Sequence, residues 1–183
     1  MMAKQFNRLA LPHRQFIAAQ HIFFVATAAP TGRVNLSPKG TNSLRVVDAT
    51  HILWRNATGS GNETAGHLRQ TPRMTLMWCA VDGPPLILRC YGSARAIHLD
   101  DPEWPTLNAN FPPDISARQM FELTIDLVQT SCGFSVPLMD YKGERPDADA
   151  WTAAKGPDGI VAYWDTTNRK TIDGFDTGIE ANL

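Results

Sequence analysis

The chain has 183 residues, 43% of them hydrophobic, and its 17 Lys+Arg against 18 Asp+Glu give a formal net charge of −1. This length is typical of a single domain, and the near-neutral balance, without a polybasic run, excludes the broad basic surface of a nucleic-acid binder. No apolar stretch reaches the ~18–20 residues of a membrane span. Three scattered cysteines without a Cys-x-x-Cys pair, and an N-terminus without a secretory pattern, predict a cytoplasmic protein with reduced thiols and no zinc site.

The order of apolar and turn residues predicts several short strands and few helices. Runs rich in β-branched and aromatic residues alternate with turn sequences such as Pro30-Thr-Gly-Arg33. Gly92 interrupts a long run and predicts a bulge or bend there. The predicted strands cover residues 21–28, 33–37, 44–47, 51–55, 73–79, 86–97 and 121–128. The predicted helices are one that ends near residue 20, one that ends at residues 71–72, and two short ones at 101–108 and 147–155.

Tight turns rather than crossover helices join most of these strands, and this favours a mainly β fold with a mainly antiparallel barrel. The segment from Gly133 onward is rich in Pro, Gly and Asp, yet apolar patches around Val161 and Trp164 are atypical of a free linker. We therefore expect one domain over residues 1–183, with the barrel at about 16–130 and a C-terminal extension at 131–183 packed on it.

The strongest local motif is Gly59-Ser-Gly-Asn-Glu-Thr64, which lies between a predicted strand and a predicted helix. Glycines allow backbone N–H groups to converge on an anion, and the helix start adds unpaired N–H groups and a positive dipole end, so this pattern is typical of a phosphate site. Ser60 and Glu63 also have the Ser-x-x-Glu spacing of a capping box, which needs no ligand. The local pattern leaves both interpretations open.

Other polar residues have weaker signals. Lys39, at the end of a predicted strand in Ser37-Pro-Lys-Gly40, could reach a phosphate as a point charge, or it could be a solvated hairpin lysine. We interpret His21 and His51 as structural because they alternate with apolar residues, and Cys132 as a structural thiol because no cation neighbours it in sequence. No Ser-His-Asp or Cys-His arrangement is evident, so no catalytic residue and no metal is predicted.

Several motifs, taken in chain order, resemble the pyridoxamine-phosphate-oxidase-related family of FMN-binding split barrels. The motifs span about residues 16–130 and are Phe23-Phe-Val-Ala-Thr27, Gly32-Arg-Val34, Ser37-Pro-Lys-Gly40, Thr58 to Leu68, Pro72-Arg-Met-Thr-Leu-Met77 and Leu88-Arg-Cys-Tyr-Gly92. The sequences Gly-Ser-Gly-Asn-Glu-Thr, Gly-Pro-Pro-Leu-Ile-Leu-Arg and Gln-Thr-Ser-Cys-Gly-Phe are similar to a branch distinct from the true pyridoxamine phosphate oxidases.

This resemblance implies an antiparallel split barrel that forms a homodimer with FMN at the interface. It implies an FMN-dependent oxidoreductase acting on a small molecule, in which the isoalloxazine performs the redox chemistry. The FMN phosphate is then expected on the backbone and hydroxyls of the glycine-rich motif, with help from a lysine. The cofactor-binding residues that we expect are Lys39, Asn56, Thr58, Ser60, Gly61, Asn62, Thr64 and Arg89.

The sequence departs from the family pattern in two places. True pyridoxamine phosphate oxidases carry Ser-Arg-Lys before the short helix, where this chain has Asn62-Glu63-Thr64, so both cations are missing. The carboxy-terminal Arg-Leu-x-Pro-Arg motif is replaced by Asn168-Arg-Lys-Thr-Ile-Asp-Gly174. Oxidation of vitamin B6 is therefore not expected, and we expect residues 168–174 to fold over the flavin edge of the same or the partner barrel.

Two other functions remain open from the sequence: a non-catalytic flavin-binding or sensor protein, and the same barrel with a deazaflavin or haem. The homodimer has a second argument in the composition of the strands. Phe23, Phe24, Leu86, Ile87 and Leu88 exceed the apolar surface that we expect one small barrel with few helices to bury. Obligate interfaces of this kind usually bury ~2,000 Å² or more.

Overall fold

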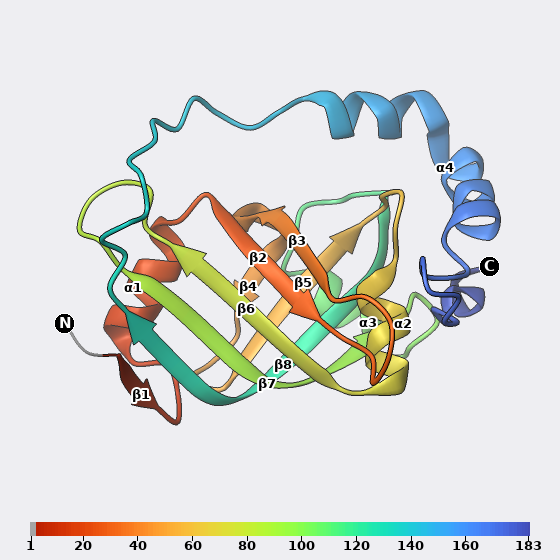
Figure 1. Cartoon of the computed structure of the whole chain (residues 1–183). Coiled ribbons are helices and arrows are strands. Elements are labelled where there is room, and N and C mark those ends of the chain that lie inside the picture. The colour runs from red at the N-terminus through yellow and green to blue at the C-terminus, as the bar shows by residue number, and fades with distance from the viewer. Residues whose placement is uncertain (1–2) are drawn as a thin grey trace.

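The computed structural model describes residues 3–183, which form one curled antiparallel sheet flanked by four helices (Figure 1). The strand order is β3-β2-β6-β7-β8-β5-β4, and β1 pairs with β8. The strands are β1 (Lys4–Phe6), β2 (Ile22–Thr27), β3 (Asn35–Gly40), β4 (Leu44–Val46), β5 (His51–Ala57), β6 (Arg73–Cys79), β7 (Ile87–Ile97) and β8 (Ala117–Ser131). The helices are α1 (Leu11–Ala19), α2 (Glu63–Gln70), α3 (Trp104–Asn108) and α4 (Asp147–Thr167), with short 3-10 helices at Thr41–Ser43 and Ile179–Asn182. The predicted antiparallel split barrel is confirmed.

Alternation of buried and half-buried residues along β2 and β6 creates the inner face of the barrel. Phe23 and Trp78 have no exposed surface, and their rings lie 6.0 Å apart in the centre of the core. β5 is buried on both faces because α3 and the following loop cover its outer side, where Leu53 packs with Phe111. The hydrophobic effect on these two layers is the main term that stabilises the barrel.

The long pair β7–β8 forms the spine of the sheet. Its register shifts between Tyr91 and Gly92, so the bulge predicted at Gly92 is confirmed. β8 pairs with β5 through its first half and with β1 through its last residues, which lets the sheet curl. The strand is longer than predicted because its first residues are buried on both faces and show no alternation.

Two elements differ from the sequence expectation. β1 was not predicted, because its three residues are exposed and carry no strand pattern. The predicted helix at 147–155 is only the first arm of α4: a kink at Gly156, whose φ of 64° is left-handed, is followed by Pro157 and a second arm that continues to Thr167. The second arm buries Ile160 and Trp164 against Ile179.

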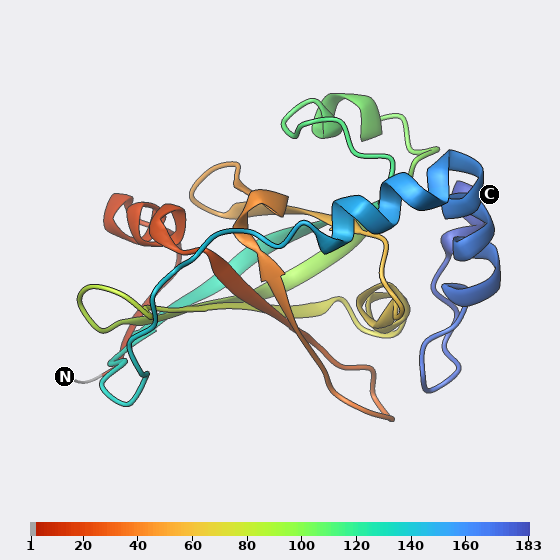
Figure 2. The same cartoon turned by 90° about the horizontal axis from the view of Figure 1, so that it is seen from above.

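Residues 132–146, called the strap below, run from the end of β8 to the start of α4 and cross the length of the molecule (Figure 1). The view from above shows that α4 and the C-terminal segment lie beyond the end of the sheet where α2 is found (Figure 2). The expected extension is therefore present and packs on the barrel. Over residues 3–183, no helix has the length and apolar character that a membrane crossing requires.

Candidate functional site

A cavity of about 670 Å³ lies between β3, the end of β5, the start of α2 and the strap. Asn35, Ser37 and Lys39 reach it from β3, because alternate residues of a strand point to the same face. β8 contributes Arg118, and the strap and the start of α4 contribute the outer wall. The loop at residues 58–62, called the glycine-rich loop below, forms the part of the wall between β5 and α2.

Two cations face this cavity without a carboxylate partner. Lys39 is mostly buried, its ammonium lies 5.4 Å from the centre of the Trp54 ring, and its pKa is lowered to about 8 by burial and then by the nearby charge of Arg118. Burial lowers the pKa of Arg118 to about 10. Among residues 3–183, neither cation forms an ion pair. A buried positive charge without a counter-ion favours an anionic ligand in the cavity.

Neutral acceptors hold the Arg118 guanidinium in place. Its Nη1 donates to Gly59 O at 3.2 Å and to Asn168 Oδ1 at 2.6 Å, and its Nη2 donates to Gly61 O at 2.6 Å. Asn56 accepts from Nε at 3.1 Å when its amide oxygen faces the guanidinium. The side chain therefore fixes two carbonyl groups of the glycine-rich loop while keeping its full positive charge beside the cavity.

The first turn of α2 has no side-chain cap. The N-cap residue is Asn62, which makes no capping hydrogen bond, and its buried Oδ1 has no partner among the described residues. Glu63 does not reach back to the helix start, because its carboxylate accepts the N–H of Ile172 at 3.1 Å. The capping box expected from Ser60 and Glu63 is therefore wrong, and the first N–H groups of α2 remain available to a ligand.

The glycines of the loop are not required by the fold. Gly59 and Gly61 have no left-handed φ. A Cβ on Gly59 would meet no heavy atom within 4 Å, and one on Gly61 would make ordinary contact with the Glu63 side chain. Since neither backbone conformation nor packing needs glycine here, the missing side chains leave open space at the edge of the cavity.

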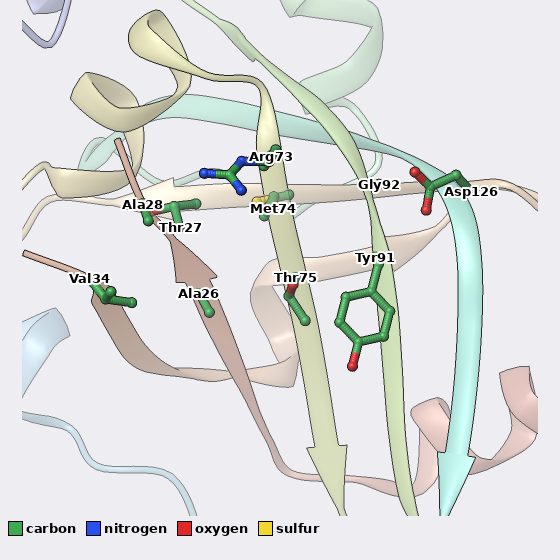
Figure 3. A pocket seen from close by; sticks show the side chains of 10 residues that line it. All are labelled: Ala26, Thr27, Ala28, Val34, Arg73, Met74, Thr75, Tyr91, Gly92 and Asp126. Atoms are coloured by element: carbon green, nitrogen blue, oxygen red, sulfur yellow. The ribbon is translucent and has the colours of Figure 1, made fainter. Parts of the chain in front are cut away.

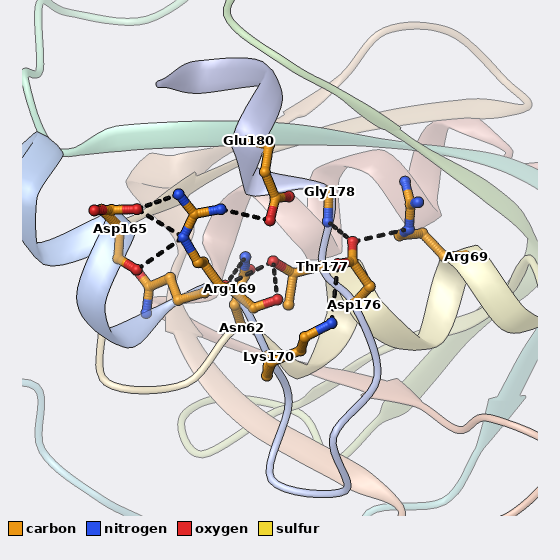
Figure 4. A network of polar contacts seen from close by, with 10 residues as sticks. Asn62, Arg69, Asp165, Arg169, Lys170, Asp176, Thr177, Gly178 and Glu180 are labelled. Atoms are coloured by element: carbon orange, nitrogen blue, oxygen red, sulfur yellow. Dashed lines mark hydrogen bonds and ion pairs between the residues drawn. The ribbon is translucent and has the colours of Figure 1, made fainter.

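Asn168 connects the C-terminal segment to the glycine-rich loop. This residue has no exposed surface, and its Nδ2 donates to Gly59 O at 3.0 Å while its Oδ1 accepts from Arg118. Thr177 donates to the Asn168 carbonyl at 2.6 Å. Figure 4 shows how ion pairs around Arg169 and Asp176 hold this segment in its bent course.

The C-terminal segment lies behind the loop rather than over the cavity. Residues 168–174 do not line the cavity. At Gly66 of α2, a Cβ would come within 2.2 Å of the Thr171 side chain, so glycine permits the close approach of the segment to the helix. The expectation that residues 168–174 cover the ligand is therefore wrong for this chain's own barrel. Their place shows that they support the loop.

The structure brings together most of the residues expected at the site. Those that line the cavity are Lys39, Asn56, Thr58, Ser60, Gly61, Asn62 and Thr64. Arg89 does not: it lies within β7, where its Nη1 donates to Ser131 Oγ at 3.2 Å. The sequence reasoning missed Arg118 and Asn35. A signal for Arg118 existed, because a charged residue inside an otherwise buried strand is rarely without a specific role.

A second, smaller hollow of about 370 Å³ lies on the outer face of the sheet, over β2, β6 and β7 (Figure 3). Thr75 and Tyr91, which pair across β6 and β7, both lie on this face. Thr27 lines the hollow from the end of β2. None of the expected cofactor-binding residues lies there, so the larger cavity is the candidate site.

The antiparallel barrel and the place of the cavity define a split-barrel protein. A family model for pyridoxamine 5'-phosphate oxidase matches residues 12–132. This match covers more than half of the chain, and the chain belongs to the pyridoxamine 5'-phosphate oxidase family. The resemblance inferred from the motifs is thereby confirmed.

Similar proteins agree with this assignment. A pyridoxamine 5'-phosphate oxidase family protein of Aspergillus flavus, ustO, is 37% identical over 132 residues, which are 69% of this chain and 53% of that protein. The chain thus spans about half the length of that relative. A structure from Lactobacillus delbrueckii, provisionally described as a pyridoxamine 5'-phosphate oxidase, covers 70% of this chain and 98% of its own, with a TM-score of 0.55 and 21% identity. HupZ of Group A Streptococcus covers 65% of this chain and 92% of its own, with a TM-score of 0.51 and 13% identity.

Proposed function

We propose that the protein binds FMN in the 670 Å³ cavity and is an FMN-dependent oxidoreductase acting on a small molecule. The observation that carries this proposal is the pair of cations, Lys39 and Arg118, that lie beside uncapped helix N–H groups without a carboxylate partner. A phosphate monoester is a compact dianion, and it would neutralise both charges at once. FMN carries this group, and the family assignment makes flavin the natural cofactor class.

The residues present fit the phosphate despite the missing Ser-Arg-Lys cations. Arg118, from β8, supplies a positive charge from behind the loop, and Lys39 supplies another from β3. The uncapped N–H groups of α2 and the Thr64 hydroxyl would hold the phosphate oxygens. The isoalloxazine supplies the redox chemistry when bound, and the chain supplies binding and orientation.

Two of the alternatives are weakened by the cavity or distinguished by simple spectra. The residues that line the cavity include no His, Cys or Met to bind haem iron. A deazaflavin or a non-catalytic flavin binder fits the same wall. Three free cysteines agree with a reducing compartment, and we propose the cytoplasm.

We also propose a homodimer, formed through the outer face of the sheet. Phe24 pairs with Met77, and Thr75 pairs with Tyr91, on the half-buried side of β2, β6 and β7. Leu36 on the edge strand β3 is 63% exposed. The expectation needs one correction: Phe23 and Leu88 lie in this chain's own core and contribute nothing to a partner surface. A second copy would cover the remaining apolar stripe and bring Arg89 of each copy toward the other.

The decisive experiment begins with the absorbance of the purified protein. A flavin spectrum, or saturable quenching of added FMN fluorescence, supports the proposal, whereas a bare protein that binds no FMN contradicts it. Bleaching of the bound flavin by NAD(P)H distinguishes an enzyme from a binder. Light scattering at micromolar concentration tests the dimer, and a stable monomer contradicts it.

Gly59→Ala tests whether the cavity holds the phosphate. A Cβ here meets no protein atom, so the free energy of unfolding should stay the same, while FMN affinity should fall about tenfold because the methyl group occupies space next to the phosphate. Gly159→Ala, on α4, is the matched control: it should raise stability by about 0.5–1 kcal/mol and leave FMN affinity unchanged. Equal FMN affinity of both variants would place the phosphate elsewhere.

A further inference from the structure

A set of hydrogen bonds connects the first turn of α2 to the β2–β3 hairpin. Thr64 and His67 are three residues apart on α2 and share a face of the helix. Thr27 and Asn35 lie opposite each other across the hairpin. The Nδ2 group of Asn35 lies 3.2 Å from Thr64 Oγ1 and 3.3 Å from Thr27 Oγ1, and Thr27 Oγ1 lies 3.1 Å from His67 Nδ1. The four side chains therefore form one connected network.

The chemistry of the amide determines the direction of these bonds. An amide nitrogen carries two hydrogens and accepts none, so both threonine hydroxyls accept from Asn35. Ser37 Oγ donates to Asn35 Oδ1 at 2.8 Å and holds the amide in this orientation. The Thr64 hydroxyl keeps its own hydrogen, for which residues 3–183 supply no acceptor. That hydrogen is free to donate into the cavity that Thr64 lines.

We propose that Asn35, held by Thr27 and His67, is a positioning residue that orients the Thr64 hydroxyl toward the ligand phosphate. This inference rests on the proposed function, because it takes the phosphate as the ligand group in the cavity. Thr27 and His67 do not line the cavity, and both are at most 3% exposed. Any effect of these two residues on phosphate binding therefore passes through Asn35.

The same bonds give the cavity wall a defined polarity. Ser37 uses its hydrogen on Asn35 and presents an acceptor to the cavity, whereas Thr64 presents a donor. A phosphate oxygen is matched to the donor, and a ligand hydroxyl is matched to the acceptor. A phosphate ester of a polyhydroxyl chain, such as the ribityl phosphate of FMN, carries these two groups side by side.

A double-mutant cycle tests the proposal. Thr27→Val, Thr64→Val, the double variant and the wild type are titrated with FMN and with riboflavin, which lacks the phosphate. Thr64→Val should weaken FMN binding ~10- to 150-fold, because a charge-assisted hydrogen bond is lost. Thr27→Val should weaken it by about fivefold, and the double variant should bind FMN no more weakly than Thr64→Val alone. Riboflavin binding should be equal in all four proteins.

Two outcomes overturn the positioning role. If the FMN losses of the single variants multiply in the double variant, Thr27 does not act through Thr64. If riboflavin binding falls as much as FMN binding, Thr27 only maintains the fold. Thr27→Ser keeps the hydroxyl and should restore FMN affinity. Should Thr27→Val fail to fold, His67→Asn, which keeps a hydrogen-bonding group near Thr27, is compared with His67→Leu, and only the leucine variant should lose phosphate affinity.

The failure of the proposed function is recognised separately. A wild type that binds inorganic phosphate but not FMN overturns the flavin proposal, and the same cycle is then measured with phosphate. A wild type that binds neither FMN nor phosphate overturns both.

Discussion

The inner wall of the cavity, built from the barrel and α2, is largely buried, whereas its outer wall at residues 144–149 is exposed throughout. On the inner wall, Arg118 and Asn62 are at most 3% exposed, and Arg118 is fixed by several acceptors. On the outer wall, the Glu144 carboxylate accepts from Tyr141 of the strap, and no contact ties it to the barrel wall. A rigid, basic wall suits the constant part of a ligand, and an adaptable wall suits the part that varies between ligands.

The largest effect is expected from Arg118→Met. It leaves the carbonyls of Gly59 and Gly61 and the Asn168 side chain without their donor. Each unpaired buried acceptor costs about 1–3 kcal/mol, partly offset by removal of a buried charge, so the free energy of unfolding should fall by roughly 2–4 kcal/mol. FMN binding should be lost. Urea denaturation and FMN titration measure the two effects.

Arg95→Met is the control for removing an arginine. Arg95 pairs with Glu103 and Glu122 on the surface, and its side chain is 52% exposed. Exposed ion pairs contribute less than about 1 kcal/mol, so stability and FMN binding should change little. Similar losses in both variants would show that Arg118 has no special place in the inner wall.

The second prediction concerns pH and Lys39. Its folded-state pKa of about 8 lies below the ~10.4 of an unfolded lysine, so the cost of burying the charge is present below pH 8 and is relieved as the pH rises toward 10.4. The ligand-free protein should therefore gain stability over this window. FMN affinity should change in the opposite direction and fall roughly tenfold between pH 7.5 and 9.5, because only charged Lys39 attracts the phosphate.

Lys39→Met should remove both pH effects, while Lys155→Met, on α4 outside the cavity, should keep them. The second ionisation of a phosphate ester, at a pKa of about 6, is complete before this window and does not contribute. A wild type whose FMN affinity is constant from pH 7 to 10 would mean that Lys39 does not face the phosphate.

The third prediction returns to Glu63, whose carboxylate accepts the Ile172 N–H instead of capping α2. Glu63→Gln keeps an acceptor for that N–H, so stability should fall by no more than about 1 kcal/mol. Because a negative charge near the helix start is removed, FMN affinity should be equal or up to about threefold better. Isothermal titration at pH 7 checks this, and a clear loss of affinity would show that Glu63 binds the ligand directly.

Local patterns predicted much of the fold. Turn residues and strand-forming runs predicted the two N-terminal hairpins, and the glycine in the long run predicted the bulge at Gly92. β1 escaped because three exposed residues pair only through the distant β8. The second arm of α4 escaped because Gly156-Pro157 is a typical stop, and only burial of Trp164 against the barrel extension shows why the helix resumes.

The site was predicted where it depends on neighbours in sequence and missed where it depends on distant contacts. The glycine-rich loop and Lys39 were found from their motifs. Arg118 acts on residues 57 and 59 positions away in sequence, and Asn35 acts on Thr64, 29 positions away, so no local spacing identifies them. The capping box had the right spacing, but Ile172 competes for Glu63 across 109 positions.

The smallest effect is expected from the outer wall. Arg145→Gln removes a charge that is exposed and lies on the strap. At an ionic strength of 0.15 M the screening length is about 8 Å, so an exposed arginine contributes little to a phosphate held by buried cations. FMN affinity should therefore fall less than about twofold, and the change should disappear in ~1 M salt, whereas the loss in Arg118→Met should persist. Stopped-flow titration of both variants at two salt concentrations measures this. A tenfold, salt-independent loss in Arg145→Gln would mean that the strap closes onto the phosphate and that the two walls act as one.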